Sequence, residues 1–300
     1  ANLAIENSAS QLRSQDESER MRRAGALVDF FDGNHRAYQE AYLAEIITDP
    51  TTLKNYQRHS RQANVTRLIV NRLAIGGEKP LRVTWADANG NEESEDALKA
   101  SLLWEQIAHQ DNKFDAFVKT VYQRTALTKT VVAAVTWDPY HGKVMFKHYT
   151  PNHIDVRRVE QNPDPARPDA YRILESEGMT GGQGEVWRYY DFSDRGPVAW
   201  TWTSGSRTAW DRAQNKNATP MDMVDPDTVE ASPAALDENG EPVPTGRALV
   251  PFVTFRTALP AHSFFVDDGQ DDLYETQLFV NQLWSQISIA LWFLSSAIPV

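Results

Sequence analysis

The chain contains 300 residues, which suits one large domain or two smaller ones, and its 41 acidic and 30 basic side chains give a net charge of -11. It contains no cysteine, which excludes disulfide bonds and thiolate metal sites and fits a reducing compartment. Hydrophobic residues make up 41% of the sequence and charged residues 24%, which is typical of a folded globular protein.

The charge is unevenly distributed along the chain. Residues 217–246 hold seven acids and residues 257–300 hold five, and neither range contains Lys or Arg. The rest of the chain is close to neutral, with 29 acids and 30 bases. Proteins that grip nucleic acid tightly use clustered Lys and Arg, which displace counterions from the phosphates. We therefore expect only weak contact with DNA.

The first quarter of the sequence predicts helices. Residues 1–20 are polar and predict a flexible N-terminal arm. Apolar residues at helical spacing then predict helices over about 19–31 and 35–47. Asp49 and Pro50 predict a break, because proline cannot continue a helix.

A further helix is predicted from about Asn64 to a stop at Gly76 and Gly77. Alternating residues over 80–85 predict a strand, and residues 94–109 and 112–127 predict two more helices. Four apolar residues share one face of the helix that follows Asn64, namely Val65, Leu68, Ile69 and Leu73.

The pattern then changes from helical to alternating. Residues 130–137 and 143–150 predict two strands that pair across a turn, where Pro139 fixes one dihedral angle and Gly142 supplies a permissive one. Residues 186–192 and 198–203 predict a second β-hairpin, and residues 249–257 a further strand. Helices followed by hairpins predict an α+β fold.

Residues from about 206 to 247 interrupt this pattern. They are rich in proline and acids and contain few large apolar side chains. Such a segment cannot bury enough surface to offset the entropy lost on ordering, so it predicts a flexible acidic insertion.

The last predicted helix, from Asp272 to about Ala297, organises the chain. Apolar residues recur four and three positions apart, so one seam runs down a helix about 40 Å long. Asp272 and Glu275 are predicted to form a capping box beside further acids, and Pro299 to end the helix. The predicted seam residues are Val280, Trp284, Ile287, Leu291 and Leu294, and the predicted acidic turn comprises Asp267, Asp268, Asp271, Asp272 and Glu275.

Three interpretations of this helix remain open: a membrane anchor, a buried core helix, or a helix packed against other copies of the chain. Gln282, Ser285, Gln286 and Ser288 interrupt the apolar run, and no Lys or Arg follows Arg256. Both features disfavour a membrane span. We favour packing within an oligomer, with the seam turned inward.

No catalytic, cofactor-binding or metal-binding residues are predicted. The glycines at 76–77 and 181–184 lack the Lys and Ser/Thr of a phosphate-binding loop and predict turns. Among the seven histidines only His148 and His153 are close in sequence, in positions that favour hydrogen bonding over metal ligation. We therefore expect a protein that is not an enzyme.

A cluster of aromatic and basic residues offers two interpretations. The cluster contains Trp200, Trp202 and Trp210 near Arg207 and Arg212, a combination that can stack single-stranded bases. Trp200 and Trp202 are two residues apart, however, and two such residues of a strand share one face. We favour the interpretation that this face is buried.

The order of these segments resembles the portal proteins of tailed bacteriophages, which are head-to-tail connectors. The matching segments are YLAEIITDPTTLKNYQ with RQANVTRLIVNRLAIGGEKPLRV, then LLWEQIAHQDNKFDAFVKTVYQRTAL running into VVAAVTWDPYHGKV, and finally LVPFVTFRT with GQDDLYETQLFVNQLWSQ. The likeness covers roughly residues 27–204 and 248–300, and it lies in the order of segments rather than in any single motif.

The resemblance implies a domain order. Residues 21–265 would form the wing domain, residues 266–298 the first stem helix, and residues 299–300 the start of a clip domain. A portal protein continues beyond that point, so the resemblance implies that the sequence is truncated before the clip.

The resemblance also implies a function. The chain would form a ring, of about twelve copies, at one vertex of the virion, assembled in the host cytoplasm. That ring would conduct double-stranded DNA without sequence specificity during packaging and ejection. Its partners would be the major capsid protein, the terminase packaging motor and a head-completion or adaptor protein, with no cofactor and no membrane. The alternative function is a membrane-anchored assembly protein that uses residues 272–298 as its anchor.

Overall fold

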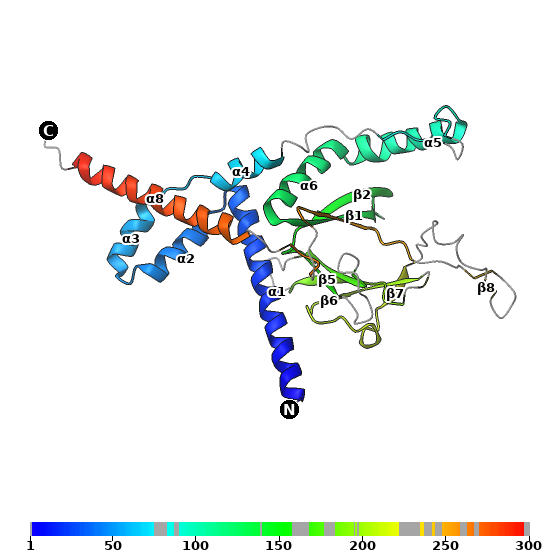
Figure 1. Ribbon diagram of the computed structural model, residues 1–300, viewed down its shortest axis with the longest axis horizontal. Coiled ribbons are helices and arrows are strands. Elements are labelled where there is room, and N and C mark those ends of the chain that lie inside the picture. Colours follow the sequence, from blue (N-terminus) through cyan, green and yellow to red (C-terminus); the bar gives the residue numbers. More distant parts are fainter. Residues whose placement is uncertain are drawn as a thin grey trace. The chain divides into compact units, whose positions relative to one another are not determined.

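The computed structural model describes the backbone of residues 2–74, 83–86, 90–138, 140–157, 168–176, 184–194, 196, 198–221, 235–236, 242–243, 248–258, 263–266 and 270–296. Side chains are described over the same ranges except at 2–16, 59, 235–236, 242–243, 270–272 and 292–296. The chain forms two compact units (Figure 1): unit 1 comprises Ala1–Val131 and Asp267–Val300, and unit 2 comprises Val132–Val266. The predicted wing therefore includes parts of both units.

Unit 1 is helical, and unit 2 is built mainly from antiparallel sheets, which confirms the predicted α+β class. A π-helical stretch, η2 (Glu105–Asp111), directly continues α5. The helices of unit 1 are α1 (Asn2–Asp32), α2 (Arg36–Ile46), α3 (Pro50–His59), α4 (Val65–Leu73), α5 (Glu95–Trp104), α6 (Phe114–Thr128) and α8 (Gln270–Ser296).

The N-terminal segment predicted as a flexible arm is helical, because α1 runs without interruption from Asn2, and its flexibility stays a prediction. The sequence contains no Gly or Pro before Gly25, so nothing in residues 2–24 opposes a helix. Glu19 pairs with both Arg22 and Arg23, each at 2.7 Å, one turn along the same helix. Hydrogen bonds from these two guanidinium groups lower the pKa of Glu19 to about 2.

The predicted break at Asp49 and Pro50 is confirmed, because α2 ends at Ile46 and residues 47–49 are not helical, but a helix that was not predicted, α3, starts directly after it. Asp49 is the N-cap, and its side chain accepts a hydrogen bond from the Thr52 amide at 2.7 Å. Pro50 occupies the first helical position, where its fixed φ suits the helix and its missing N–H needs no partner. Asp followed by Pro thus starts a helix here.

Two further predictions in this region have different outcomes. The strand predicted over residues 80–85 is absent from its described part, since residues 83–86 have no regular structure. The predicted helices over 94–109 and 112–127 are confirmed as α5 with η2 and as α6. Lys113 separates them in the left-handed region, with φ of 49°.

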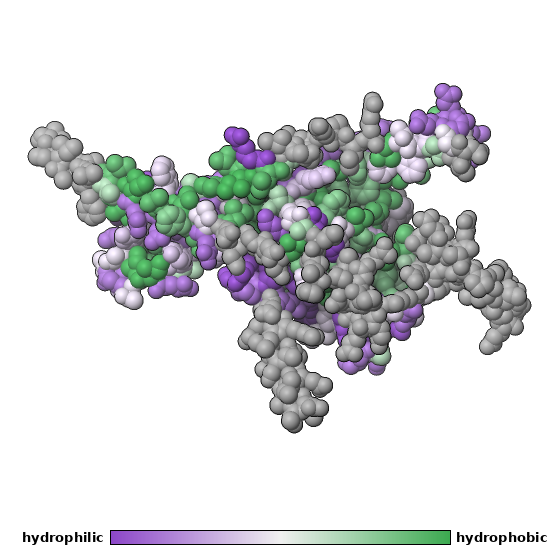
Figure 2. Space-filling view, viewed as in Figure 1, coloured by the Kyte–Doolittle hydropathy of each residue, from purple (hydrophilic) through white to green (hydrophobic). Residues whose placement is uncertain are grey.

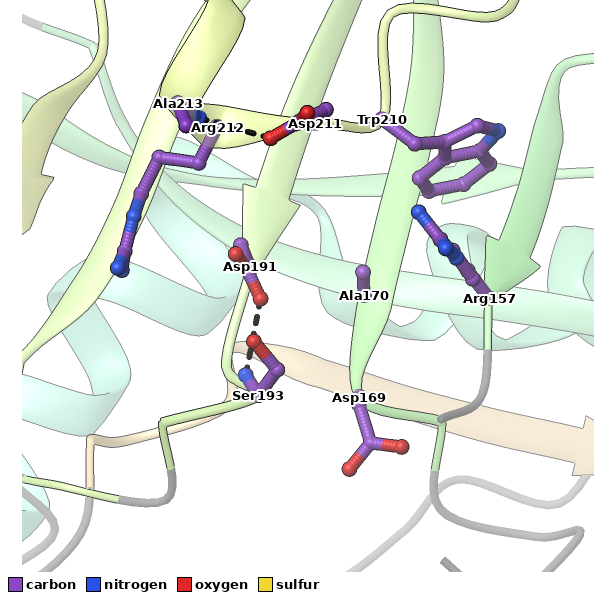
Figure 3. A pocket seen from close by; sticks show the side chains of 9 residues that line it. All are labelled: Arg157, Asp169, Ala170, Asp191, Ser193, Trp210, Asp211, Arg212 and Ala213. Carbon is purple, nitrogen blue, oxygen red and sulfur yellow. Dashed lines mark hydrogen bonds between the residues drawn. The ribbon is translucent and has the colours of Figure 1, made fainter. Parts of the chain in front are cut away.

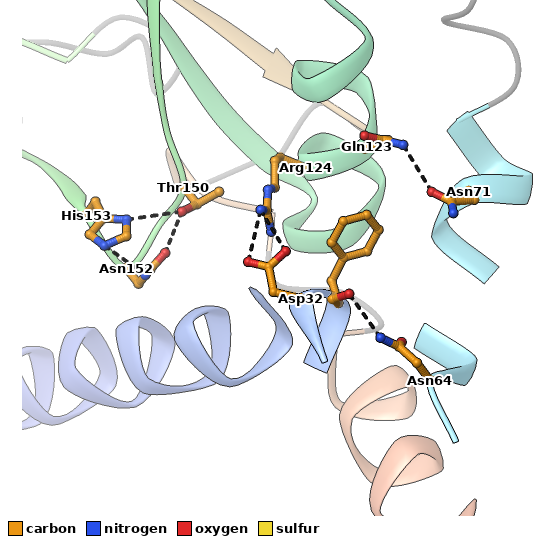
Figure 4. Close-up of polar contacts among 9 residues, drawn as sticks. Asp32, Asn64, Asn71, Gln123, Arg124, Thr150, Asn152 and His153 are labelled. Carbon is orange, nitrogen blue, oxygen red and sulfur yellow. Dashed lines mark hydrogen bonds and ion pairs between the residues drawn. The ribbon is translucent and has the colours of Figure 1, made fainter. Parts of the chain in front are cut away.

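The apolar core of unit 1 joins helices from distant parts of the chain. Leu27, Phe31, Val70 and Leu127 form its centre, and Leu273 packs against them from α8. Polar contacts support the same packing (Figure 4), including the ion pair of Arg124 with Asp32 at 3.1 Å. Other contacts drawn there are the hydrogen bonds from Asn64 Nδ2 to the Phe31 carbonyl at 3.0 Å and from Gln123 Nε2 to Asn71 Oδ1 at 3.0 Å.

The larger sheets of unit 2 have the orders β10-β1-β2 and β3-β4-β5-β6-β7, and all pairs described by register are antiparallel. A separate short pair joins β8 (Ala235–Leu236) to β9 (Pro242–Val243). The strands of the two larger sheets are β1 (Thr130–Asp138), β2 (Lys143–Tyr149), β3 (Ile154–Arg157), β4 (Ala170–Ser176), β5 (Val186–Asp191), β6 (Ala199–Ser204), β7 (Thr219–Met221) and β10 (Phe252–Arg256).

Both predicted hairpins are confirmed. In the first, Val135 of β1 faces Phe146 of β2, and Gly142 in the turn has φ of +62°, which favours glycine. Pro139 lies outside the described residues. In the second hairpin, Tyr189 of β5 faces Trp202 of β6.

The predicted flexible insertion from about 206 to 247 is wrong over its first part. Residues 206–221 fold as a short 3-10 helix, η3 (Arg212–Gln214), followed by β7, which pairs with β6. Local polar contacts hold this stretch: Asp211 accepts from the Ala213 amide at 2.9 Å, and Asn217 Nδ2 donates to the Thr203 carbonyl at 2.8 Å. Apart from β8 and β9, the remainder of the predicted insertion lies outside the described residues.

The five-stranded sheet contains a buried ion pair. Arg172 of β4 is 2% exposed, and its Nη2 lies 3.0 Å from Asp155 Oδ2 of β3. The guanidinium carbon also lies 5.2 Å from the ring of Trp187 and 5.1 Å from the ring of Trp210. Burial lowers the pKa of Arg172 to about 10, because the low-polarity surroundings disfavour its charged form.

We predict that Asp155→Ala destabilises unit 2 by about 3–5 kcal/mol, because the charge of Arg172 stays buried after losing its carboxylate. The matched control is Glu175→Ala, which breaks the more exposed pair with Arg188 and should cost no more than about 1 kcal/mol. Urea unfolding of both variants measures the difference. Equal losses in the two variants would show that burial of the Arg172 pair carries no special cost.

Candidate functional site

The long C-terminal helix α8 is the most unusual feature of unit 1. It begins at Gln270, so Asp272 lies inside the first turn, and the predicted capping box with Asp272 as N-cap is wrong. Acids in this turn still favour the positive end of the helix dipole. Glu275 is exposed, whereas Asp267, Asp268 and the side chains of Asp271 and Asp272 lie outside the described residues, as do Pro299 and the side chain of Leu294.

From Gln277 onward the face of α8 that turns into unit 1 is largely polar, although Leu273 and Leu278 of the same helix also pack inward. Gln277, Asn281 and Ser285 recur every four residues, so they lie in one row along the helix, and each is no more than 1% exposed. We call these three residues the polar row. A core-facing helix normally buries an apolar stripe, so this arrangement requires specific hydrogen-bond partners.

The partners of the polar row lie between α3 and α4. Gln277 Oε1 accepts from the Thr66 amide at 2.9 Å, and its Nε2 donates to the Ala63 carbonyl at 2.7 Å. Asn281 Oδ1 accepts from the Ala63 amide at 3.1 Å, and Ser285 Oγ accepts from the Arg61 amide at 2.9 Å.

These contacts give hydrogen-bond partners to backbone groups of the half-exposed chain at 61–64, which forms no helix or strand. They also fix the rotation of α8 about its own axis, because amide and hydroxyl groups bond only in particular directions.

His35 completes the network from the start of α2. It is 2% exposed, its ring stacks on Phe30 with centroids 5.3 Å apart, and its Nδ1 lies 3.2 Å from Asn281 Nδ2. Because Asn281 Nδ2 is a donor, Nδ1 of a neutral His35 accepts in this contact. Burial lowers the pKa of His35 below its usual 6.5. Gln39 of α2 joins the same network through a 2.9 Å hydrogen bond to Ser285 Oγ.

The opposite face of α8 is apolar and exposed. Trp284 is 51% exposed and Leu291 is 61% exposed, and no acidic or basic residue follows Glu275 in this helix. We call the exposed apolar residues of this face the α8 stripe. It contains three predicted seam residues, Trp284, Ile287 and Leu291, together with Phe279 and Leu283, and the predicted seam residue Val280 is half-buried beside it.

The shorter helix α4 likewise buries a polar residue and exposes apolar ones. Its buried side carries Thr66 and Val70, whereas Leu68, Ile69 and Leu73 are exposed. The latter three, which we call the α4 stripe, belong to the face that the sequence pattern predicted. Figure 2 shows hydrophobic surface over α4 and along part of α8. The α4 stripe and the α8 stripe are therefore exposed apolar helix surfaces of unit 1, a kind of surface that marks interaction sites.

Unit 2 contains a polar pocket of about 370 Å³ (Figure 3). Asp191 accepts from the Ser193 amide at 2.9 Å, and Asp211 accepts from the Ala213 amide at 2.9 Å. Arg212, which lines the pocket, forms an ion pair with Asp194, which does not line it. The charged lining residues are Arg157, Asp169, Asp191, Asp211 and Arg212, with Trp210 beside them. No sequence motif indicated this pocket, because its lining comes from separate segments that are brought together by the sheet.

The aromatic cluster near this pocket is largely occupied by contacts within the chain. Trp202 is buried, stacks on Tyr189 with centroids 5.3 Å apart, and donates from Nε1 to the Ala209 carbonyl at 2.8 Å. Trp200 is half-buried beneath Arg212, whose guanidinium carbon lies 4.8 Å from the ring. The buried interpretation is confirmed for Trp202 and holds only in part for Trp200.

Two other kinds of feature, a metal site and a membrane-spanning helix, are absent from the described residues. His153 Nδ1 lies 3.4 Å from Thr150 Oγ1, in the hydrogen-bonded role predicted for it (Figure 4). Within the described ranges no three His, Cys, Asp or Glu side chains are grouped so that they could hold a metal ion. None of the helices in the described part has the length and hydropathy needed to cross a membrane.

Comparison with known proteins returned no match: no family model fits the chain, and no curated protein is significantly similar to it.

We predict that His35 makes unit 1 sensitive to acid. Because its folded pKa lies below its unfolded value, its contribution to stability is present above about pH 6.5 and is lost as the pH falls toward the folded pKa. His35→Gln removes the titration, so the wild type should lose up to about 1.4 kcal/mol more per pH unit than the variant below pH 6.5. Chemical unfolding at several pH values measures both profiles, and parallel profiles would contradict the prediction.

Proposed function

We propose that this chain is a ring-forming structural subunit of the portal type, which assembles at one capsid vertex of a tailed bacteriophage. The observation that carries the proposal is the inverted polarity of α8. Its buried side is the polar row of Gln277, Asn281 and Ser285, and its exposed side carries Trp284 and Leu291. A helix that turns its apolar side to solvent requires a partner, and a stripe without charge suits another copy of the same chain.

The energetic argument favours repeated packing of this helix. Fully burying an exposed Leu, Ile or Phe side chain contributes roughly 1.5–3 kcal/mol. The α8 stripe offers several such side chains, and a ring repeats the same contact at every subunit boundary. In a single chain these side chains stay exposed, so the stabilisation is gained only when copies associate. The segment order that resembles portal proteins supports the choice of a ring over other assemblies.

The proposed ring is a conduit rather than an enzyme. Double-stranded DNA would pass through it without sequence-specific contact, during packaging and ejection, and a separate terminase motor would hydrolyse ATP. The ring would also serve as a docking platform for the major capsid protein and for a head-completion or adaptor protein. The net charge of -11 supports weak contact with phosphates, because a duplex must slide through the channel.

We predict that Leu291→Asp abolishes ring formation, because a carboxylate would be buried without a partner at every subunit boundary. Leu291 is 61% exposed in the single chain, so the substitution should leave unit 1 folded. Gln282→Asp, on another side of the same helix, is the control and should retain rings. Size-exclusion chromatography with light scattering measures the mass of each variant. Rings of wild-type mass from Leu291→Asp would refute the proposal.

A further prediction concerns DNA. The chain should bind duplex DNA near the weak end of nonspecific affinities, with a Kd of about 10⁻⁴ to 10⁻⁶ M at physiological salt. Fluorescence anisotropy with duplexes of different sequence measures the affinity, which should not depend on sequence. Submicromolar binding at that salt concentration would contradict a sliding contact.

A further inference from the structure

A closed ring of more than two copies needs two different complementary surfaces on each subunit. One surface contacts the preceding copy and the other contacts the following copy. The α8 stripe supplies one apolar surface of unit 1, and the α4 stripe supplies a second one with different residues. The inference below rests on the proposed ring and identifies the surface that receives the α8 stripe.

The α4 stripe is held in a fixed orientation. Asn64 caps the helix by accepting from the Arg67 amide at 2.8 Å, and Thr66 donates from both its amide and its hydroxyl to Gln277 Oε1. Thr66 and Val70 are fully buried, so the other side of α4 must face outward. Leu68 and Leu73, both more than 60% exposed, are therefore presented on a rigid surface.

The exposed side of α4 also carries positive charge. Arg72 is exposed, four residues after Leu68 and next to Leu73, so its side chain emerges within the α4 stripe. The helix contains Arg67 and Arg72 and no acid. The α4 surface is thus apolar, with a basic side chain near the C-terminal end of the helix.

The complementary charge lies beside the start of the α8 stripe. Glu275 is exposed and lies four residues before Phe279, so it flanks the start of the stripe. The helix α8 contains three acids, Asp271, Asp272 and Glu275, and no Lys or Arg. Both side chains are exposed in the described chain. In a ring, Arg72 of one copy can therefore meet Glu275 of the next copy across a subunit boundary.

We propose that the α4 stripe of one copy packs against the α8 stripe of the next copy. In this interface Leu68, Ile69 and Leu73 contact Phe279 and the residues that follow it along α8, and Arg72 faces Glu275. The charge pair at the edge fixes which ends of the two stripes meet, because opposite charges attract there and like charges would repel. The contact is heterologous and repeats around the ring.

Charge reversal tests the pairing directly. Arg72→Glu and Glu275→Arg should each raise the concentration needed for half-assembly at least about tenfold, because each places like charges together at every boundary. The double variant Arg72→Glu/Glu275→Arg restores opposite charges and should assemble like the wild type. Light scattering across a dilution series measures assembly. A double variant no better than either single variant would overturn the proposed pairing.

Mixing the two single variants separates contact between copies from contact within one chain. In an equal mixture, a copy with Arg72→Glu meets a copy with Glu275→Arg, so both kinds of boundary carry opposite charges when the copies alternate around a twelve-membered ring. The mixture should therefore assemble although neither variant does so alone. Native mass spectrometry should find equal numbers of both variants in each ring. Failure of the mixture to assemble would overturn the interface.

The matched control is Arg58→Glu, a charge reversal at an exposed position of α3, which should leave assembly unchanged within about twofold. Circular dichroism of all variants checks that unit 1 stays folded. If Arg72→Glu leaves rings intact whereas Leu291→Asp abolishes them, the ring stands and α4 is not the receiving surface. If both variants leave the wild-type mass unchanged, the proposed function itself fails.

Discussion

The hydrogen bonds between α8 and the chain that joins α3 to α4 determine the arrangement of unit 1. Apolar contacts alone would allow a helix to rotate or slide, since hydrophobic attraction has no direction. Gln277 and Asn281 instead bond to defined backbone groups of Ala63 and Thr66. These bonds form only when α8 has one rotation about its axis and one position along that axis. The exposure of the α8 stripe is therefore a consequence of how its opposite face is held.

This arrangement sets limits on what the network tolerates. A buried amide or hydroxyl costs free energy unless its hydrogen bonds are made, and partly satisfied networks are poor sources of stability. In the described structure Nε2 of His35 and Oε1 of Gln39 are buried without a hydrogen-bond partner. Neutral His35 suits this position, because a second proton would leave a buried charge and remove the acceptor that Asn281 uses. The network thus gives unit 1 geometric precision at some cost in stability.

Much of the secondary structure follows from the sequence pattern, and the misses have identifiable causes. The hairpin of β1 and β2 was predictable because alternation and a Gly142 turn agree. Asp49 and Pro50 were correctly taken as the end of one helical stretch, but α3 was missed because the same two residues that interrupt a helix also suit the start of the next one. The strands β3, β4 and β7 were missed because their residues acquire a regular pattern only beside neighbouring strands.

The candidate site was predictable in part. The spacing of Trp284, Ile287 and Leu291 predicted that they share one side of the helix, and all three are exposed in the single chain, although sequence alone cannot say that this side faces away from the rest of the chain. The polar row was visible as Gln277, Asn281 and Ser285 at intervals of four, but its significance depends on Ala63, whose backbone lies more than 200 residues earlier. The pocket in unit 2 left no pattern at all, because its lining is assembled by the sheet.

Unit 1 is formed by two separate segments of the chain, so its parts are synthesised at different times. The helices α1 to α6 emerge first, yet their partner α8 follows only after all of Val132–Val266 has been made. Domains generally fold as units during synthesis, so unit 2 can form while unit 1 still waits for its last helix. The α8 stripe is made only after unit 2, and the polar row orients it through the chain that joins α3 to α4. An incomplete chain thus lacks the surface through which it would associate, and folding of one subunit becomes a precondition for its recruitment by others.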